Sequence, residues 1–173
     1  ISGVYLYFGQ ADSALQSYRN VLAMREQMGD KAGIANAHYS IGRCYYGMGK
    51  TEIAIEHYIK ALKGFEEVGD KERMATSLNN IGMIYNDHGR HDKAFDYFLK
   101  GLAICEEIGN NRAMIPILIN LGSTYQMTKE YKKELEYLNR ALKISHNFGD
   151  KPREANILLN IAANYLHDSL SDE

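Results

Sequence analysis

The segment DHGRHD, residues 87–92, contains the side chains best suited to metal chemistry. His88 and His91 lie three positions apart, with Asp87 and Asp92 beside them. Imidazole and carboxylate groups are ligands of zinc, but a zinc ion takes three or four protein ligands that converge on it. Whether this segment is a metal site therefore depends on the elements that present it.

A second segment has part of the pattern of a phosphate-binding loop. CYYGMGKT, residues 44–51, ends in Gly-Lys-Thr, but Cys44 stands where the first glycine of such a loop belongs. A phosphate-binding loop follows a β-strand, whereas this segment is expected to join two helices. No Ser/His/Asp or Cys/His set recurs at a definable site. We therefore predict no enzymatic activity, no metal and no cofactor.

The composition is that of a folded domain. The chain has 173 residues, of which 45% are hydrophobic and 24% charged. A net charge of −2 gives no electrostatic basis for binding nucleic acid or an anionic membrane. No apolar run approaches the roughly 20 residues of a membrane span, and no signal-peptide pattern opens the chain. Two cysteines are too few for a disulfide framework, so we expect a cytoplasmic protein without membrane insertion.

The sequence repeats itself every forty residues. The clearest marker is a joint that reads MGDK (28–31), VGDK (68–71), IGNN (108–111) and FGDK (148–151). A repeat of this length indicates an array of small structural units that bury their apolar faces against one another. We divide the single domain, residues 1–173, into a partial unit (1–30), three full units (31–70, 71–110 and 111–150) and a second partial unit (151–173). The chain starts with Ile1 rather than Met, so we expect it to be part of a longer protein.

Each full unit is predicted to contain two antiparallel helices. In residues 71–110, Ile81 and Tyr85 share one helix face, and Ala94, Phe98 and Leu102 form an apolar stripe in the next helix. The glycine of each joint suits the left-handed conformation that ends a helix, and the Asp or Asn after it is a preferred N-cap. Small residues inside the stripes predict close helix contacts; they are Gly42, Gly82, Gly122, Ala162, Ala54 and Ala94.

This pattern resembles the tetratricopeptide repeat. Residues 79–102 carry the signature residues of that repeat: Ile-Gly-x-x-Tyr, then Gly, Ala, an aromatic residue and Leu. The segment reads NNIGMIYNDHGRHDKAFDYFLKGL. The period is forty rather than ~34 residues because both helices are longer. The resemblance implies an all-α fold, a right-handed α-solenoid of antiparallel helix pairs (the tetratricopeptide superhelix), which binds peptides or proteins. The unit is also similar to spindle-orientation adaptors with Leu-Gly-Asn repeats and to bacterial tetratricopeptide regions in signalling proteins.

The repeat argues against a metal site at His88 and His91. The same turn in the other units reads YFGQAD (7–12), GMGKTE (47–52) and MTKEYK (127–132), and none carries a ligand pair. Tyr residues also recur at forty-residue spacing, as packing residues rather than an aromatic cage, at positions 5, 45, 85, 125 and 165. His38 stands where later units have leucine, which predicts a core or half-buried histidine.

By the resemblance, the first helix of each unit lines a concave groove. One column of this groove reads Ser40, Asn80, Asn120 and Asn160. Beside it we place Asn36, Tyr39, Arg43, Tyr46, Asn79, Met83, Asn86, Ser123, Gln126 and Asn156. An Asn amide both donates and accepts hydrogen bonds, and Asn is a mediocre helix former, so its recurrence suggests contact with a peptide main chain. The alternative is that these amides are simply solvated.

Three functions follow from this interpretation. The first is a non-enzymatic scaffold that holds an extended peptide of a partner protein in the groove. The second is the sensory or regulatory arm of a larger bacterial signalling protein, a histidine kinase or transcription regulator. The third is end-to-end self-association. Leu158, Ile161 and Tyr165 in the last helix lack the second helix that would cover them, so we expect this end to be covered by a neighbouring chain or by further sequence of the parent protein.

The unit at 111–150 is expected to be irregular. Pro116 lacks an N–H and should kink its helix or delay its start, whereas Pro152 falls in a first turn and should be harmless. Glu134 stands where Ala54 and Ala94 allow close packing. Lys129 replaces the turn glycines of the two preceding units.

Overall fold

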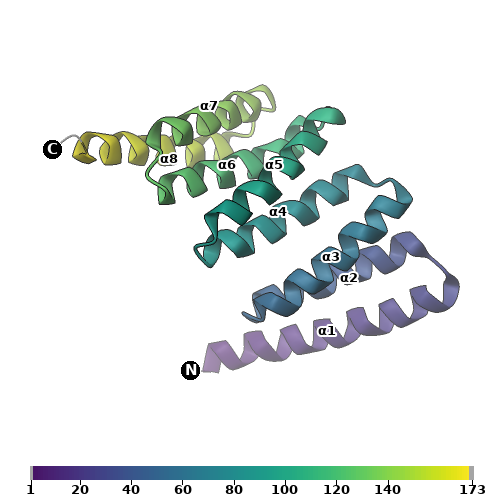
Figure 1. Cartoon of the computed structure of the whole chain (residues 1–173). Coiled ribbons are helices and arrows are strands. Elements are labelled where there is room, and N and C mark those ends of the chain that lie inside the picture. The colour runs from purple at the N-terminus through teal and green to yellow at the C-terminus, as the bar shows by residue number, and fades with distance from the viewer. Residues whose placement is uncertain (1, 172–173) are drawn as a thin grey trace.

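The computed structural model describes residues 2–171, and the side chains of residues 11–167, as a stack of eight helices. Consecutive helices run antiparallel, and the two termini lie at opposite ends of the stack (Figure 1). Within residues 2–171 there is no strand, and no helix is long and apolar enough to cross a membrane. The predicted all-α solenoid of antiparallel helix pairs is confirmed. The helices are α1 (Ser2–Met28), α2 (Lys31–Gly47), α3 (Thr51–Val68), α4 (Lys71–Asp87), α5 (His91–Glu107), α6 (Asn111–Met127), α7 (Tyr131–Asn147) and α8 (Lys151–Ser171).

The joints between units form as the sequence predicts. Each joint glycine has a φ between 65° and 72°; these are Gly29, Gly69, Gly109 and Gly149. The side chain of the next residue accepts a hydrogen bond from the backbone N–H three positions on, at 2.9–3.2 Å; these caps are Asp30, Asp70, Asn110 and Asp150. Each cap contributes about 1 kcal/mol.

A large side chain of the second helix packs on a glycine of the first helix in each full unit. The ring of Phe98 lies so close to Gly82 that a Cβ there would come within 2.6 Å of it. At the other two contacts, an added Cβ would lie 3.1 and 3.2 Å from the facing side chain. The three glycines are therefore required by close helix packing, as predicted. The pairs are Gly42–Tyr58, Gly82–Phe98 and Gly122–Leu138. Ala54 and Ala94 are buried, whereas Ala162, for which a close contact was also predicted, is exposed.

The turn predicted at residues 7–12 does not form. Helix α1 continues through this segment from Ser2 to Met28. The uninterrupted helix keeps the backbone hydrogen bonds that a turn would break.

The predicted late start of the helix at Pro116 is wrong. Helix α6 begins at Asn111, as the first helices of the other full units begin after their caps, and it passes through Pro116 to Met127. Pro116 leaves the carbonyl of Arg112 without its helical donor, but both residues are exposed, so water reaches this turn. Burial of Ile115 and Ile117 on the other side keeps the segment helical.

Lys129 adopts the backbone conformation of the glycine that it replaces. Its φ is 62°, whereas Gly49 and Gly89 have φ values of 72° and 69° in the equivalent turns. Among residues 2–171, no other non-glycine residue has a positive φ. A residue with a Cβ is strained by about 1–2 kcal/mol in this conformation.

Replacing Lys129 with glycine should therefore raise the free energy of unfolding by about 1 kcal/mol, because relief of strain outweighs the added entropy of the unfolded chain. Urea unfolding followed by circular dichroism measures the change. Lys143→Gly, at an exposed position inside α7, is the matched control and should cost about 1 kcal/mol. A loss at both positions would show that Lys129 is not strained.

Helix α8 is covered on one side. Leu158 and Tyr165 are 51% and 58% exposed, as the sequence predicts. Ile161, which was expected to be uncovered with them, is only 9% exposed. It belongs to the core cluster that contains Leu138 of α7 and Ile157, because it points toward the preceding unit.

Candidate functional site

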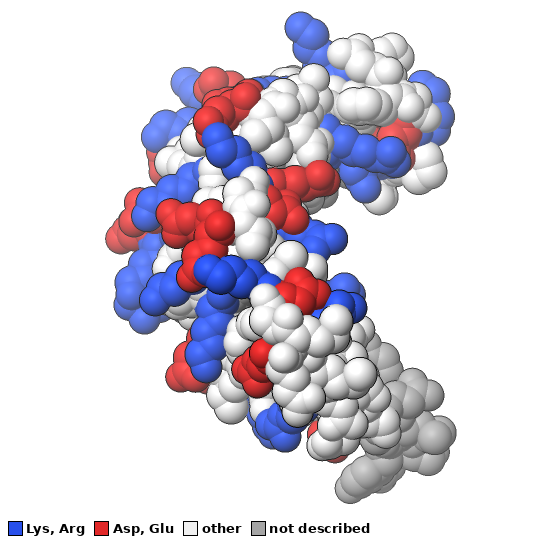
Figure 2. Space-filling view, turned by 90° about the vertical axis from the view of Figure 1, so that its right-hand side faces the viewer, with Lys and Arg blue, Asp and Glu red and all other residues white. Residues whose placement is uncertain are grey.

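The hollow side of the curved stack is the candidate binding surface. Figure 2 shows a crescent outline in which charged side chains of both signs crowd the outer side and fewer border the hollow. Helix α4 contacts α6 of the next unit directly. Neighbouring elements come closest on the inner side of a curve, so the first helices α2, α4, α6 and α8 face the hollow.

The N-terminal end of this surface contains a groove between α1 and α2. Two pockets of about 360 and 210 Å³ share Tyr18 and Ser40 in their linings. The predicted residues Asn36, Ser40 and Arg43 lie here, and Arg43 is exposed. Tyr18, 39% exposed, is a lining residue that sequence analysis missed, because aromatic residues at its repeat position are buried in the other units. We call this feature the α1/α2 groove.

The central asparagines link neighbouring first helices. Asn80 Nδ2 donates to the Tyr39 hydroxyl at 3.0 Å, and Asn120 Nδ2 donates to Asn79 Oδ1 at 2.9 Å. Both bonds join residues 41 positions apart, so each crosses from one unit to the next. Asn80 and Asn120 are half-buried. The column therefore ties the units together, and part of each amide remains exposed to solvent.

Asn79 lies between the units. Its side chain is 7% exposed, its Oδ1 accepts from Asn120, and its Nδ2 lies 3.6 Å from the Met83 sulfur. Asn79 therefore offers little surface to a ligand, contrary to its predicted place in the groove, because the close approach of α4 and α6 covers it.

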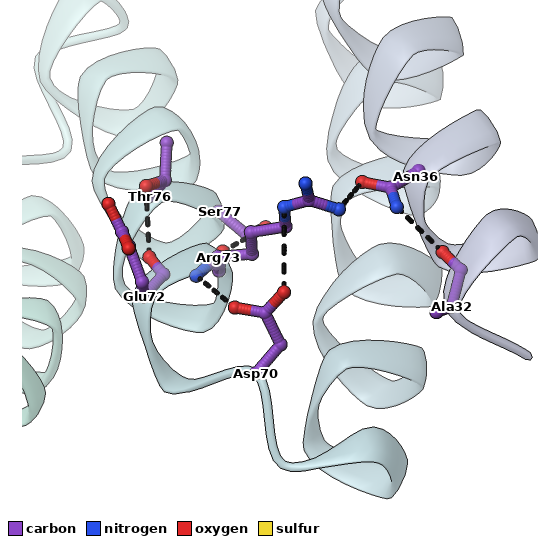
Figure 3. A network of polar contacts seen from close by, with 7 residues as sticks. All are labelled: Ala32, Asn36, Asp70, Glu72, Arg73, Thr76 and Ser77. Atoms are coloured by element: carbon purple, nitrogen blue, oxygen red, sulfur yellow. Dashed lines mark hydrogen bonds and ion pairs between the residues drawn. The ribbon is translucent and has the colours of Figure 1, made fainter.

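A polar network joins α4 to α2 (Figure 3). Arg73 donates through Nη1 to Asn36 Oδ1, and its Nε lies 3.5 Å from Asp70 Oδ2. Asn36 Nδ2 in turn donates to the Ala32 carbonyl at 2.9 Å. The Arg73 guanidinium also lies over the Phe65 ring, 5.8 Å from its centroid. This network orients Asn36. It could not be predicted from the repeat, because glycine or alanine stands at the Arg73 position in the units on either side.

The remaining predicted residues lie on the first helices α2, α4, α6 and α8. The Tyr46 hydroxyl donates to Asp87 Oδ2 at 2.7 Å, and this hydrogen bond, together with burial, raises the pKa of Tyr46 to about 12. Asn86 Oδ1 lies 3.0 Å from His91 Nδ1. Half-buried members of the set are Met83, Asn86, Ser123 and Gln126; the exposed ones are Arg43, Asn156 and Asn160.

His88 and His91 make separate local contacts. His88 Nδ1 lies 2.8 Å from the Ile84 carbonyl, and its Nε2 lies 3.3 Å from the Thr51 hydroxyl. His91 faces Asn86 instead. In the part of the chain that the structure describes, no three His, Cys, Asp or Glu side chains are grouped to hold a metal. Both rings stabilise the turn between α4 and α5.

A half-buried histidine pair lies between α2 and α3. The Nδ1 atoms of His38 and His57 are 3.1 Å apart, so one ring must be neutral and accept. His57 also packs on Tyr45, with ring centroids 5.6 Å apart. Burial, followed by the charges of His38, Lys60 and Arg19, lowers the pKa of His57 to about 4. The ring contact between Tyr45 and His57 has equivalents in the next two units, where two tyrosines stack at the same positions. These pairs are Tyr85–Tyr97 and Tyr125–Tyr137.

This pair should make the fold sensitive to acid. A histidine whose pKa is lowered by folding stabilises the native state fully above its ordinary value of 6.5, and that contribution is lost as the pH falls toward 4. His57→Tyr, which copies the later units, should remove this part of the pH dependence. Thermal unfolding between pH 7 and pH 5 tests it. Equal slopes for the original chain and for His57→Tyr would contradict the assignment.

Comparison with known proteins identifies similar sequences and folds. A tetratricopeptide repeat family model matches residues 1–67, 33–107 and 73–146. No curated protein sequence matches the chain. Among solved structures, BtubC from P. vanneervenii superposes with a TM-score of 0.73 and 18% identity, covering 94% of this chain and 83% of that one.

Two further structures superpose more closely. The apo form of RapI has a TM-score of 0.84 and 22% identity, over 93% of this chain and 45% of that one. Aspartyl phosphate phosphatase F from Bacillus subtilis has a TM-score of 0.84 and 17% identity, over 99% of this chain and 45% of that one. The chain thus spans less than half the length of these two proteins, and the likeness concerns the helical stack alone.

Proposed function

Because the chain belongs to the tetratricopeptide repeat family, we propose that it is a binding scaffold without chemistry of its own, which holds an extended segment of a partner protein along its hollow side. One observation carries this proposal: half-buried amides stand at one-unit spacing across the hollow, at Asn80 and Asn120, and exposed Asn160 continues the column. Amide groups are complementary to peptide N–H and C=O groups. Contacts of this kind read the main chain of the partner, so we expect broad sequence specificity.

The affinity should be moderate. Each neutral hydrogen bond contributes about 0.5–1.5 kcal/mol to binding, whereas ordering a flexible peptide costs roughly 2–5 kcal/mol. The amide contacts alone therefore only offset the cost of ordering the peptide. Apolar contacts must supply the rest, from Tyr39, Tyr46, Met83 and the 57%-exposed Met127. We expect a Kd near micromolar, about −8 kcal/mol. Exposed Arg43 favours an acidic residue or a free carboxylate at the N-terminal end.

Replacing Asn80 and Asn120 together with alanine should weaken peptide binding by about 1–3 kcal/mol, since two amide contacts are removed. A peptide selected from a library is titrated calorimetrically against the variant. The substitutions also delete two hydrogen bonds between units, so the free energy of unfolding should fall by about 1–3 kcal/mol. Circular dichroism must therefore confirm a folded protein at the titration temperature.

The matched control is Asn139→Ala, an exposed position on the second helix α7, which should leave affinity and stability unchanged. Unchanged affinity in the double variant, or a peptide footprint on the second helices, would refute the amide column as the binding site.

A second candidate is the regulatory arm of a larger signalling protein. RapI is one of the similar structures, and another is a signal-transduction ATPase from Pyrococcus horikoshii with a tetratricopeptide repeat sensor, of which this chain covers 27%. Sequencing the gene beyond these 173 residues tests this candidate. A kinase or DNA-binding segment in the same reading frame would support it.

A further inference from the structure

A pocket of about 270 Å³ lies between the start of α3, the end of α4 and the turn that follows α4. We call it the α3/α4 pocket. Its apolar lining comes from Ile55, Ile84 and the ring of Tyr85, and its other lining residues are polar. A cavity of roughly 150 Å³ holds a benzene ring, whereas sites for drug-sized ligands and cofactors measure about 300–1,000 Å³. The α3/α4 pocket therefore has room for one aromatic side chain.

The next unit shows what fills the equivalent place. Phe95 stands at the repeat position of Ile55, and its ring lies against Tyr125 with the centroids 4.4 Å apart. Tyr125 is the equivalent of Tyr85, and each of these two rings stacks on a tyrosine of its own second helix at 5.4 Å. In the part of the chain that the structure describes, Tyr125 thus has two aromatic neighbours and Tyr85 has one. Because Ile55 is smaller than Phe95, the place of the second ring stays open as the α3/α4 pocket.

Two charged residues of the lining favour an aromatic ring that carries a hydrogen-bond donor. Arg90 lies 5.6 Å from the Tyr85 centroid and, among the described residues, forms no ion pair. Its exposed guanidinium can therefore cover the face of a second ring in a cation–π contact. The Glu52 carboxylate accepts a single long hydrogen bond, 3.4 Å from the Thr51 hydroxyl, and keeps capacity for further donors. A phenol O–H or an indole N–H needs such an acceptor when its ring is buried.

We infer that the α3/α4 pocket receives a tyrosine or tryptophan side chain of a partner protein. The ring inserts beside Tyr85 as Phe95 lies beside Tyr125, the exposed Arg90 side chain moves over its outer face, and its O–H or N–H donates to Glu52. Tyrosine and tryptophan are among the residues that contribute most to binding at protein interfaces. No residue of the amide column lines this pocket, so it is a contact separate from the one proposed for the hollow.

Titration of the isotope-labelled chain with capped amino acids, followed by two-dimensional NMR, tests this inference. N-acetyltryptophanamide and N-acetyltyrosinamide should shift the backbone amide signals of residues 51–55 and 84–90 in a saturable manner. N-acetylphenylalaninamide should bind roughly fivefold more weakly, because it lacks the hydrogen bond to Glu52. N-acetylleucinamide, which has no ring to place beside Tyr85, should not bind measurably.

Three variants separate the pocket from the rest of the surface. Ile55→Phe copies the next unit and fills the pocket with a ring of the chain itself, so it should abolish binding of every capped amino acid. Ile53→Phe, at a 37%-exposed position on the same helix outside the pocket, is the matched control and should bind normally. Glu52→Ala should keep binding but remove the preference for tryptophan and tyrosine over phenylalanine.

Circular dichroism spectra equal to that of the original chain establish that the variants are folded. Binding that survives Ile55→Phe, equal affinities of the original chain for the tryptophan and phenylalanine compounds, or shifts confined to other residues would each overturn the inference. If Ile55→Phe does not fold, the exposed position Glu52 still decides, because a preference unchanged in Glu52→Ala would overturn it as well. Saturable binding of free indole without binding of either capped amino acid would show a site for small molecules and overturn the assignment to a partner protein.

Discussion

Replacing Phe98 with alanine is expected to lower the free energy of unfolding by about 3–5 kcal/mol, the range for removing a buried aromatic side chain. Phe98 is 0% exposed and lies in the main core cluster with Ala94 and Leu102. One side of its ring rests on Gly82, which has no side chain to move into the vacated space. The cavity therefore stays largely open, and the loss should fall in the upper part of the range.

Urea unfolding of Phe98→Ala and of its neighbour Leu99→Ala measures this effect. Leu99 is 43% exposed, so its truncation should cost less than about 1 kcal/mol. The Gly82 contact is tested separately. Gly82→Ala should be destabilising, because its Cβ would lie 2.6 Å from the Phe98 ring. Its cost should shrink when Phe98→Leu is also present. Equal losses for Phe98→Ala and Leu99→Ala would contradict the packing described above.

Replacing Asn164 with alanine is expected to cost about 3 kcal/mol, although Asn164 lies near the open end of the stack. Its Nδ2 donates to Glu134 Oε2 at 2.8 Å and to the Tyr131 carbonyl at 2.8 Å. Glu134 and Asn164 are 1% and 2% exposed. Without the amide, the Glu134 carboxylate is left in the core without this donor, and burial of an uncompensated charge is strongly unfavourable.

The cost should depend on pH with a defined sign. Burial raises the pKa of Glu134 above its ordinary value, and the hydrogen bond from Asn164 opposes that rise. A carboxyl group with a raised pKa favours folding in its protonated form, and this contribution is lost as the pH rises through the folded-state pKa. The deficit of Asn164→Ala should therefore be smaller at pH 4 than at pH 7. A deficit that is equal at both pH values would contradict a charged Glu134 in the folded state.

A double substitution separates the pair from its surroundings. Ala54 and Ile84, 0% and 2% exposed, occupy the positions of Glu134 and Asn164 at the junction of α3 and α4. Glu134→Ala with Asn164→Ile copies that apolar pair and should be at least as stable as the original chain, because replacing both partners of a buried hydrogen bond with apolar groups can be nearly neutral or stabilising. A double variant less stable than Asn164→Ala would show that the site cannot be repacked.

Much of the architecture could be predicted from the sequence. The joint glycines, their Asp or Asn caps and the glycines beneath Tyr58, Phe98 and Leu138 recur at forty-residue spacing, and each depends on contacts within one unit or with the next. Such contacts are repeated with the sequence, so the fold follows from the period. Even Lys129 keeps the turn of the glycines, because the surrounding helices impose it.

The side chains that differ between units could not be placed this way. Asn79 and Asn80 are adjacent and chemically identical, yet the curvature of the stack buries the first and leaves the second half-open to the hollow. The contacts Arg73–Asn36 and Glu134–Asn164 join residues 37 and 30 positions apart and have no counterpart in the other units. The sequence by itself therefore determined the helix pairs and their order. Only the tertiary structure decided which polar side chains meet, because that depends on the angle between successive units, which no local pattern encodes.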